Sequence, residues 1–343
     1  MLQYLVILLD DTSTSYCYYN INKTKRGLIS LEDLKTGIIF AMKQNLMIQF
    51  VYPSYEIPMA YKETIETIDH IKIMPADLEH ISTADVVIFN SCKEFSEENI
   101  EKNKDKIFVL RTSGRDVACH VSTVERASGT RDVARHVSTV ECASGSGDVA
   151  HHVSTVENVK RLNIMITDIE TFTDENFNSY EQTLSELASA IHKAYFNGKT
   201  PQINILTDRI ELEKMNSCNA GVENITLAPN VNFYVCPAFY YENEKDNIGN
   251  LKDGLNIKNQ QLYKLEYARL CRTCDAYQCK RCVWLNRKTT LEVNTPSHEQ
   301  CVVSHLERNE SKELLNELKQ AGYFPNREIP AIDYLDPFDL IAN

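Results

Sequence analysis

The sequence predicts an α/β protein in which a degenerate, partly open (β/α) barrel is followed by a small cysteine-rich domain. Short apolar runs alternate with amphipathic stretches on both sides of an internal repeat, which is typical of parallel strands joined by helical crossovers. Seven of the eleven cysteines then fall between residues 218 and 301. A chain of 343 residues, 43% of them hydrophobic, is long enough to bury a sizeable core beside such a domain.

Residues 1–111 contain the first strands and the first crossover helix. The expected strands are buried and parallel, and they cover Leu5–Leu9, Met47–Tyr52, Val86–Asn90 and Ile107–Leu110. Ser30 is a suitable N-cap for a helix that ends at Asn45, almost directly before the second strand. The apolar face of this helix should carry Leu31, Leu34, Ile38 and Met42.

Residues 112–157 form an insertion with a tandem repeat. Asp116–Glu125 recurs as Asp132–Glu141 and as Asp148–Glu157, with a period of 16 residues. Solenoid repeats are longer, roughly 20 to 50 residues, and drift more, so this near-identity indicates a recent tandem duplication. We interpret its three aligned histidines as copies rather than as a metal array. We expect the insertion to be exposed and disordered, and deletion of residues 113–156 to leave fold and metal content unchanged.

Residues 158–214 return to the α/β pattern and belong with residues 1–111. Strands at Leu162–Thr167 and Ile203–Thr207 should enclose a long helix, Asn176–Tyr195. The core face of this helix carries Tyr180, Leu184, Leu187 and Ile191. Residues 215–310 form the cysteine-rich domain. Residues 311–343 form a helix at about Lys312–Ala321, with Gly322 as its C-cap, and an extended tail.

Composition excludes several classes of function. A formal net charge of −12 argues against nucleic-acid binding, which depends on neutralising phosphates. No stretch approaches the roughly 20 apolar residues that span a bilayer, and Leu5–Leu9 is too short for a signal peptide. No Walker or Rossmann glycine loop and no Ser/His/Asp or Cys/His signature stands out. We expect a cytoplasmic protein with no membrane partner, whose clustered cysteines are metal ligands or catalytic thiols.

The cysteine pattern carries the functional prediction. Its spacing is Cys-x17-Cys, a gap, Cys-x2-Cys-x4-Cys-x2-Cys, then x18-Cys. The seven candidate metal ligands are Cys218, Cys236, Cys271, Cys274, Cys279, Cys282 and Cys301. Structural zinc sites separate their two Cys-x-x-Cys pairs by a dozen or more residues, whereas a compact run completed by a distant cysteine is typical of [4Fe-4S] clusters. Iron–sulfur is the leading prediction and zinc the alternative.

Seven ligands are one fewer than two four-thiolate sites require. This count allows two clusters, one of which completes its coordination with another ligand, or one cluster with a partial site. Arg269, Arg272, Lys280 and Arg281 could stabilise a negatively charged cluster or be ordinary surface charge. Trp284, two residues after Cys282, is expected to shield the metal site.

The order of these cysteines resembles the SPASM domain, the auxiliary-cluster extension of radical SAM peptide maturases. Ala228–Cys236 is similar to that domain's hairpin, with Val231 where glycine is usual, and Ile248–Leu251 is similar to its short Gly-Asn element. The two inner cysteine spacings are each one residue shorter than is usual. The resemblance implies that Cys218, Cys236 and Cys282 serve a first cluster. It assigns a second cluster to Cys271, Cys274, Cys279 and Cys301.

The Cys-x3-Cys-x2-Cys triad that binds the S-adenosylmethionine cluster in radical SAM enzymes is missing. Cys17 follows the first strand, where such a loop would fall, and is interpreted as an ordinary buried or semi-buried cysteine. The opening Tyr4–Tyr18, the segment Leu28–Pro53 and the seven-cysteine end resemble the CXXX repeat peptide maturase family. Those proteins lack the triad and accompany a true radical SAM protein and a small peptide rich in Cys-x-x-x repeats.

The resemblance implies an accessory maturation factor for a ribosomally made cysteine-repeat peptide. One or two [4Fe-4S] clusters would act with a partner radical SAM enzyme. They would either relay electrons to it or bind a substrate thiolate at an incompletely coordinated iron. The alternative is a peptide-binding scaffold stapled by zinc, without redox chemistry. Both an enzymatic and an accessory role stay open.

Overall fold

The structure is a computed structural model that describes residues 2–78, 81–91, 94–113, 156, 158–213, 215, 217–276, 278, 279 and 281–329. The disorder predicted for the insertion and the extended tail predicted beyond residue 329 lie outside the described residues. Within them, no helix is long and apolar enough to cross a membrane.

A single sheet of nine strands organises the molecule, in the order β7-β6-β5-β4-β3-β2-β1-β8-β9. Every neighbouring pair is parallel except β8 and β9, which are antiparallel. The strands are β1 (Tyr4–Leu8), β2 (Met47–Val51), β3 (His70–Pro75), β4 (Val86–Phe89), β5 (Ile107–Thr112), β6 (Arg161–Ile166), β7 (Gln202–Ile203), β8 (Asn224–Leu227) and β9 (Phe233–Tyr234). A separate small hairpin pairs β10 (Gly249–Asn250) with β11 (Gly254–Leu255).

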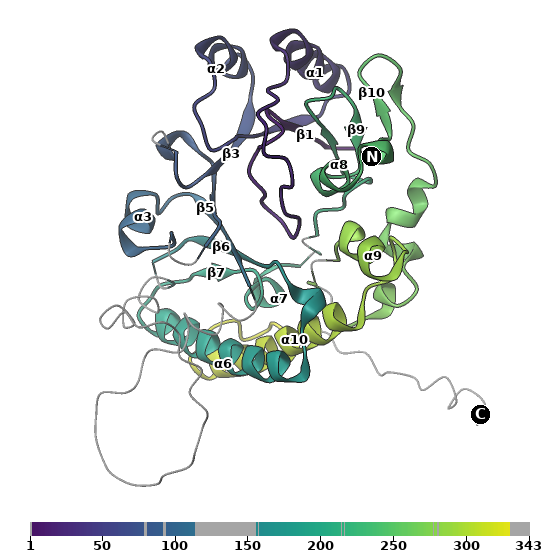
Figure 1. Cartoon of the computed structure of the whole chain (residues 1–343). Coiled ribbons are helices and arrows are strands. Elements are labelled where there is room, and N and C mark those ends of the chain that lie inside the picture. Colours follow the sequence, from purple (N-terminus) through teal and green to yellow (C-terminus); the bar gives the residue numbers. More distant parts are fainter. Residues whose placement is uncertain are drawn as a thin grey trace, which may run out of the picture.

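Helices surround the curved sheet, and the C-terminal elements close its lower and right-hand sides in the view of Figure 1. The α-helices are α1 (Leu31–Lys43), α2 (Met59–Ile65), α3 (Glu97–Lys102), α6 (Asp174–Phe196), α7 (Asp208–Glu211), α8 (Pro237–Glu242), α9 (Val283–Thr290) and α10 (His298–Gln320). Short 3-10 helices are η1 (Ile81–Thr83), η2 (Ile169–Thr171), η3 (Glu244–Asp246), η4 (Gln260–Tyr263), η5 (Leu265–Tyr267) and η6 (Cys271–Thr273).

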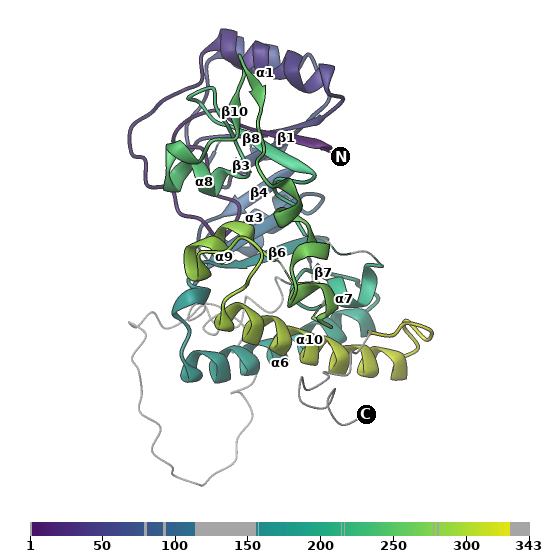
Figure 2. The same ribbon diagram turned by 90° about the vertical axis from the view of Figure 1, so that its right-hand side faces the viewer.

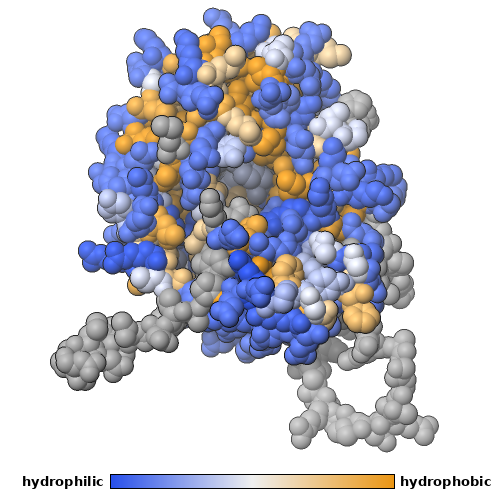
Figure 3. Space-filling view, turned by 180° about the vertical axis from the view of Figure 1, so that it is seen from behind, coloured by the Kyte–Doolittle hydropathy of each residue, from blue (hydrophilic) through white to orange (hydrophobic). Residues whose placement is uncertain are grey.

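The sheet has the order of a partial barrel. Strands β1 to β7 lie side by side in sequence order, and β8 returns to the other side of β1. The edge strands β7 and β9 do not pair with each other, so the described sheet stays open between them. The predicted α/β class with a parallel, partly open barrel is therefore confirmed at this level. Seen from behind, a mostly hydrophilic surface is hollowed near its middle, with apolar residues along much of the rim (Figure 3).

The predicted strands are confirmed with small shifts in their ends, and two details differ. His70–Pro75 forms β3, a strand that the apolar-run criterion missed because polar His70 and Lys72 alternate with its apolar residues. The strand predicted at Ile203–Thr207 is reduced to β7, because the Thr207 hydroxyl and backbone turn the chain back toward Ile203.

Helix α1 begins as predicted, because the Ser30 side chain accepts a hydrogen bond from the Asp33 backbone N–H. Its predicted face is wrong at one position: Met42 is 64% exposed. Gly37 lies on the buried face instead, and a Cβ atom added there would meet Leu227 of β8 at 2.5 Å. The absent side chain lets α1 lie close to the sheet.

The last helix is much longer than predicted. Helix α10 begins at His298, where Ser297 caps it, and runs through the expected domain boundary at residue 310. It lies beside α6 in both ribbon views (Figures 1 and 2). Tyr180 of α6 donates to Glu307 of α10 at 2.9 Å, and Glu307 also forms an ion pair at 3.1 Å with Arg209, which is fully buried. This polar contact joins the helix pair to α7.

Candidate metal centres

Eight cysteines in the described part of the chain gather around two cavities, and no disulfide joins them. One cavity, of about 420 Å³, is lined by group I, which we define as Cys17, Cys218, Cys236 and Cys282. The other is lined by group II, defined as Cys271, Cys274, Cys279 and Cys301. Of the seven cysteines predicted from the sequence, three thus belong to group I and four to group II. Cys17 is the fourth member of group I.

Group II comes from the irregular segment before α9 and from the first turn of α10. Cys271 begins η6 and Cys274 ends it, while Cys301 lies one turn into the long helix. Burial raises the pKa of the Cys271 thiol to about 11 and that of Cys279 to about 12. Burial and the neighbouring Cys274 also raise the pKa of Cys301. Without a bound cation these three thiols stay protonated at neutral pH.

Cationic and polar groups lie around group II. Arg281 lowers the pKa of Cys271 against the effect of burial, and Arg209 acts in the same direction on Cys279. His305 Nε2 is 3.5 Å from Cys274 Sγ, and burial, with Arg308 nearby, lowers the His305 pKa. Positive charge and a neutral imidazole are suitable surroundings for a negatively charged metal–thiolate centre.

Group I is assembled from four distant parts of the chain. Cys236 and Cys282 are the N-cap residues of α8 and α9, and Cys282 Sγ accepts from the Leu285 backbone N–H at 3.4 Å. Cys218 is exposed in the segment before β8, and Cys17 is half-buried in the loop after β1. The Cys282 pKa is raised well above its ordinary value, first by a side-chain hydrogen bond with Cys17 and then by burial.

Arg111, at the end of β5, holds the loop that carries Cys17. Its Nε donates to the Cys17 carbonyl oxygen at 3.0 Å, and its Nη2 donates to the Tyr19 carbonyl oxygen at 2.7 Å and to Asn20 Oδ1 at 2.8 Å. Arg111 is itself buried and also contacts Asn90 at 3.0 Å. One guanidinium therefore fixes three positions within four residues around Cys17.

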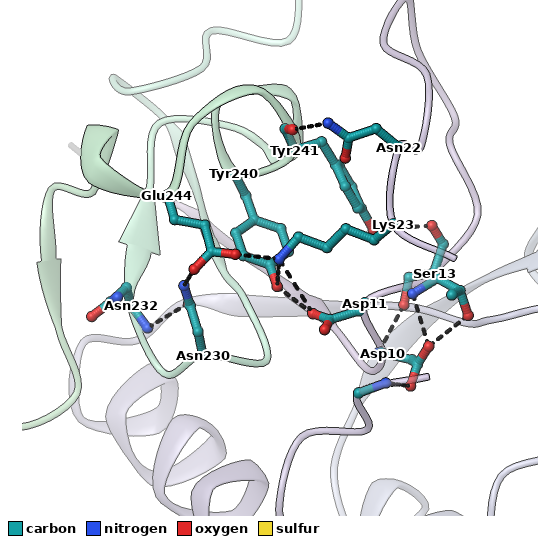
Figure 4. Close-up of polar contacts among 12 residues, drawn as sticks. Asp10, Asp11, Ser13, Asn22, Lys23, Asn230, Asn232, Tyr240, Tyr241 and Glu244 are labelled. Carbon is teal, nitrogen blue, oxygen red and sulfur yellow. Dashed lines mark hydrogen bonds and ion pairs between the residues drawn. The ribbon is translucent and has the colours of Figure 1, made fainter. Parts of the chain in front are cut away.

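The same loop is tied to α8, directly after Cys236, by the polar network of Figure 4. Lys23 Nζ lies 2.6 Å from the Tyr240 hydroxyl and 2.5 Å from Glu244 Oε1, and the Tyr240 hydroxyl donates to Asp11. Asn22 donates to the Tyr241 carbonyl oxygen at 2.6 Å. These contacts hold the segments that carry Cys17 and Cys236 in a fixed relation.

Aromatic packing reinforces this connection. The rings of Tyr19 and Tyr241 stack at a centroid distance of 5.4 Å, with 15° between their planes. Trp284 lines the group I cavity, is 7% exposed and donates from Nε1 to Glu242 at 2.6 Å. The predicted position of Trp284 beside the cysteines agrees with this geometry, and its shielding role stays a prediction.

Sequence reasoning missed Cys17 as a member of the group. The only signal was arithmetic: seven ligands are one fewer than two four-thiolate sites need. Cys17 lies 201 residues before Cys218, so no spacing rule links the two. Of the basic residues expected near the cysteines, Arg281 is buried and donates to the Tyr263 carbonyl oxygen at 2.5 Å.

Two kinds of metal site use several thiolate ligands, namely zinc sites and iron–sulfur clusters. In a tetrahedral zinc–thiolate site the sulfur atoms are about 3.8 Å apart, given Zn–S bonds of about 2.3 Å. Among the described residues, the ligand atoms that lie within 4.8 Å of one another belong to Cys274, Asp275 and His305, not to three cysteines. Each group offers four soft thiol donors, and such a set suits an iron–sulfur cluster or a zinc ion.

No family model and no curated sequence matches the chain. Among solved structures, hexahistidine-tagged anSMEcpe with bound AdoMet aligns with a TM-score of 0.60 and 15% identity, over 95% of this chain and 99% of that chain. Native anSMEcpe with bound AdoMet and Cp18Cys peptide aligns with a TM-score of 0.59 and 15% identity, over 93% and 99%. The complex of anSMEcpe with Kp18Cys peptide gives 0.59 and 14%, over 92% and 99%. The chain shares this fold over nearly its whole length.

Proposed function

We propose that the protein is an accessory maturation factor for a ribosomally made cysteine-repeat peptide, working with a partner radical SAM enzyme. It would belong with the CXXX repeat peptide maturases, and residues 215–310 would be its SPASM-type domain. Group II would hold one [4Fe-4S] cluster, and Cys218, Cys236 and Cys282 would bind another. The separation of the cysteines into two groups around two cavities carries this proposal.

Two further observations support it. The SPASM resemblance divides the seven cysteines into the same three and four that line the two cavities. The fold is that of a chain whose structures contain AdoMet and, in two cases, a peptide. A fold of this kind beside two thiol groups favours a place in peptide modification over an unrelated scaffold.

Bound [4Fe-4S] clusters would supply one-electron transfer, accepting an electron from a low-potential donor protein and passing it to the partner enzyme. The chain's own residues hold the thiols and place positive charge nearby. At Cys279, for example, burial raises the thiol pKa while the positive charge of Arg209 acts in the opposite direction. The described part of the loop after β1 contains one cysteine, Cys17, so the initiating SAM chemistry is assigned to the partner.

The peptide would bind near the cavities rather than along an edge of the sheet. The outer side of β9 is already in use, because Ile248 N–H donates to the Phe233 carbonyl oxygen at 2.7 Å and Leu251 N–H to that of Val231 at 3.1 Å. The opposite edge strand, β7, has only two residues. Group I lines a cavity of about 420 Å³, so a peptide bound at the mouth of this cavity would lie beside the first cluster.

A zinc-stapled peptide-binding scaffold is the second candidate. The close approach of Cys274, Asp275 and His305 favours it. However, Asp275 forms an ion pair with Arg308, and Lys312 is 3.8 Å from its other oxygen. A carboxylate neutralised in this way is a poor metal ligand, so the iron–sulfur proposal explains the arrangement better.

The decisive experiment is anaerobic purification of the full chain with iron, sulfide and zinc quantified per molecule. We expect about eight irons with matching sulfide and a broad absorption band near 400 nm. Cys274→Ser should remove about four irons, and Cys119→Ser, at a repeat position that is also occupied by arginine and histidine, should remove none. Stoichiometric zinc without sulfide would overturn the redox proposal and leave the scaffold.

A further inference from the structure

We propose that Cys17 is the fourth thiolate ligand of the first cluster site, completing the set of Cys218, Cys236 and Cys282. This inference rests on the proposed function and raises the number of protein ligands at the first cluster site from three to four. The first site then has four protein thiolates, and the missing eighth ligand comes from the loop after the first strand rather than from the cysteine-rich domain.

The loop after β1 and the cysteine-rich region meet at one cavity. Cys17, Cys218, Cys236 and Cys282 all line the same cavity, and Tyr16, Tyr18 and Tyr19 line it from the Cys17 side. No carboxylate or imidazole from the described loop after β1 shares that lining. The Glu223 carboxylate also lines the cavity, but it accepts a hydrogen bond from Asn219 at 2.8 Å. The Cys17 side chain hydrogen-bonds with that of Cys282, and a thiolate is the ligand that iron–sulfur clusters prefer.

The loop that carries Cys17 is held from two sides. An ordinary buried cysteine needs only apolar contacts, but the Cys17 segment receives Arg111 from β5 on one side. On the other side it is fixed to α8 by Lys23 and by the stacking of Tyr19 on Tyr241. Such supporting contacts are what a metal ligand requires, because they fix its position before the metal binds.

The consequence concerns chemistry. A cluster with three protein thiolates has an open iron that could bind a thiolate of the substrate, whereas a cluster with four has none. Group II also offers four thiols. With Cys17 as a ligand both sites are closed, which favours electron relay over direct binding of a substrate thiolate.

The test compares single and double variants of the full chain purified anaerobically. Cys17→Ser should lower iron from about eight per chain toward four, or leave about seven with the electron paramagnetic resonance signal of a [3Fe-4S] cluster. Cys17→Ser/Cys236→Ser should contain as much iron as Cys236→Ser alone, because both changes affect one cluster. Cys17→Ser/Cys301→Ser should lose iron from both sites. Cys119→Ser is the thiol control and should match the wild type.

Each outcome has a separate meaning. If the wild type carries two clusters and Cys17→Ser keeps full iron, sulfide and an unchanged spectrum, the ligand inference is wrong while the proposed function stands. If the wild type carries zinc, the proposed redox function fails, and loss of one zinc in Cys17→Ser would still identify the ligand. Far-ultraviolet circular dichroism of every variant shows whether a loss of metal reflects a loss of fold, and an unfolded Cys17→Ser is replaced by Cys17→Ala. A wild-type protein that contains no metal would overturn both the ligand inference and the proposed function.

Discussion

At the scale of single residues, a buried positive charge holds the loop after β1 in place. The Arg111 guanidinium is buried and donates to carbonyl oxygens that belong to the loop after β1. Removing one partner of such a buried, charge-assisted contact costs more than the contact itself contributes, since the remaining groups lose their donors.

Arg111→Met should therefore destabilise the protein by about 2–3 kcal/mol and release the Cys17 loop. We expect lower iron at the group I site and unchanged iron at group II, measured by metal analysis and by urea unfolding. Arg26→Met is the control, because Arg26 is exposed in the same loop and only stacks on Tyr55, at 4.0 Å. Equal effects of the two substitutions would show that Arg111 has no special role in the loop.

A second residue-scale effect is the titration of Glu310 on α10. Burial and the neighbouring Glu313, Glu317 and Glu181 raise the pKa of this carboxyl from 4.5 to about 7. Between these two values the folded protein binds more protons than the unfolded chain. The free energy of unfolding must therefore fall as the pH rises from 4.5 to about 7.

Glu310→Gln should remove this fall, since an amide does not titrate. Because Glu310 is only half-buried and partly screened by solvent, we expect the variant to be more stable than the wild type by up to about 1 kcal/mol at pH 8. The two should be equally stable near pH 4. The free energy of unfolding, measured with urea across this pH range, tests the prediction. Glu63→Gln, at an exposed position, is the control. A difference that grows toward low pH would contradict the assignment.

At the scale of elements, the small β10–β11 hairpin shows how backbone geometry constrains sequence. Gly249 has a φ of +120°, and a Cβ atom there would overlap the Gly254 carbonyl oxygen across the hairpin. Gly254 has a φ of +82° but open space around it. The hairpin also borders β9, since Asn232 and Asn250 form an isolated bridge.

Gly249→Ala should cost about 3 kcal/mol, because it combines a disfavoured φ with a clash against backbone. Gly254→Ala, the matched control, should cost about 1 kcal/mol from its φ alone. Urea unfolding of the two variants gives the comparison. If both variants lost the same amount, the close approach of the two backbones in the hairpin would be in doubt.

At the scale of the whole molecule, the parallel sheet sets a minimum length for the segment that connects β5 to β6. Strands β5 and β6 are parallel neighbours, with Thr112 opposite Ile166 and Ile107 opposite Arg161. The chain must therefore return about 17 Å along the sheet between them. Deleting residues 113–156 would leave four residues, which reach at most about 18 Å and cannot also pass over a face of the sheet. The sequence-based expectation for that deletion needs revision.

Deletion of residues 116–147 removes two repeat units and leaves 16 residues between β5 and β6. We expect this variant to keep its iron and its melting temperature within about 3 °C of the wild type. Deletion of 113–156 should give insoluble protein or a much lower melting temperature, measured by circular dichroism. Normal stability of the longer deletion would argue against the parallel pairing of β5 with β6.

Local patterns in the sequence were sufficient for most elements of the fold and for seven of the eight gathered cysteines. The apolar strands, the N-cap at Ser30 and the Cys-x-x-Cys pairs are each encoded within a few residues, so spacing alone reveals them. The alternation in β3 and the Ser297 N-cap of α10 are also local patterns, but a search for continuous apolar runs does not detect them.

Only the tertiary structure showed that Cys17 lies beside three other cysteines and that α1 packs closely on the sheet. Whether a cysteine lies beside others depends on contacts among Arg111, Lys23 and the α8 aromatics, which are far apart in the chain. Gly37 faces the sheet close to Leu227, whereas Met42, which the apolar pattern also placed on the buried face, is exposed. Sequence periodicity fixes which residues can face inward, while the free energy of packing distant segments together decides which ones meet.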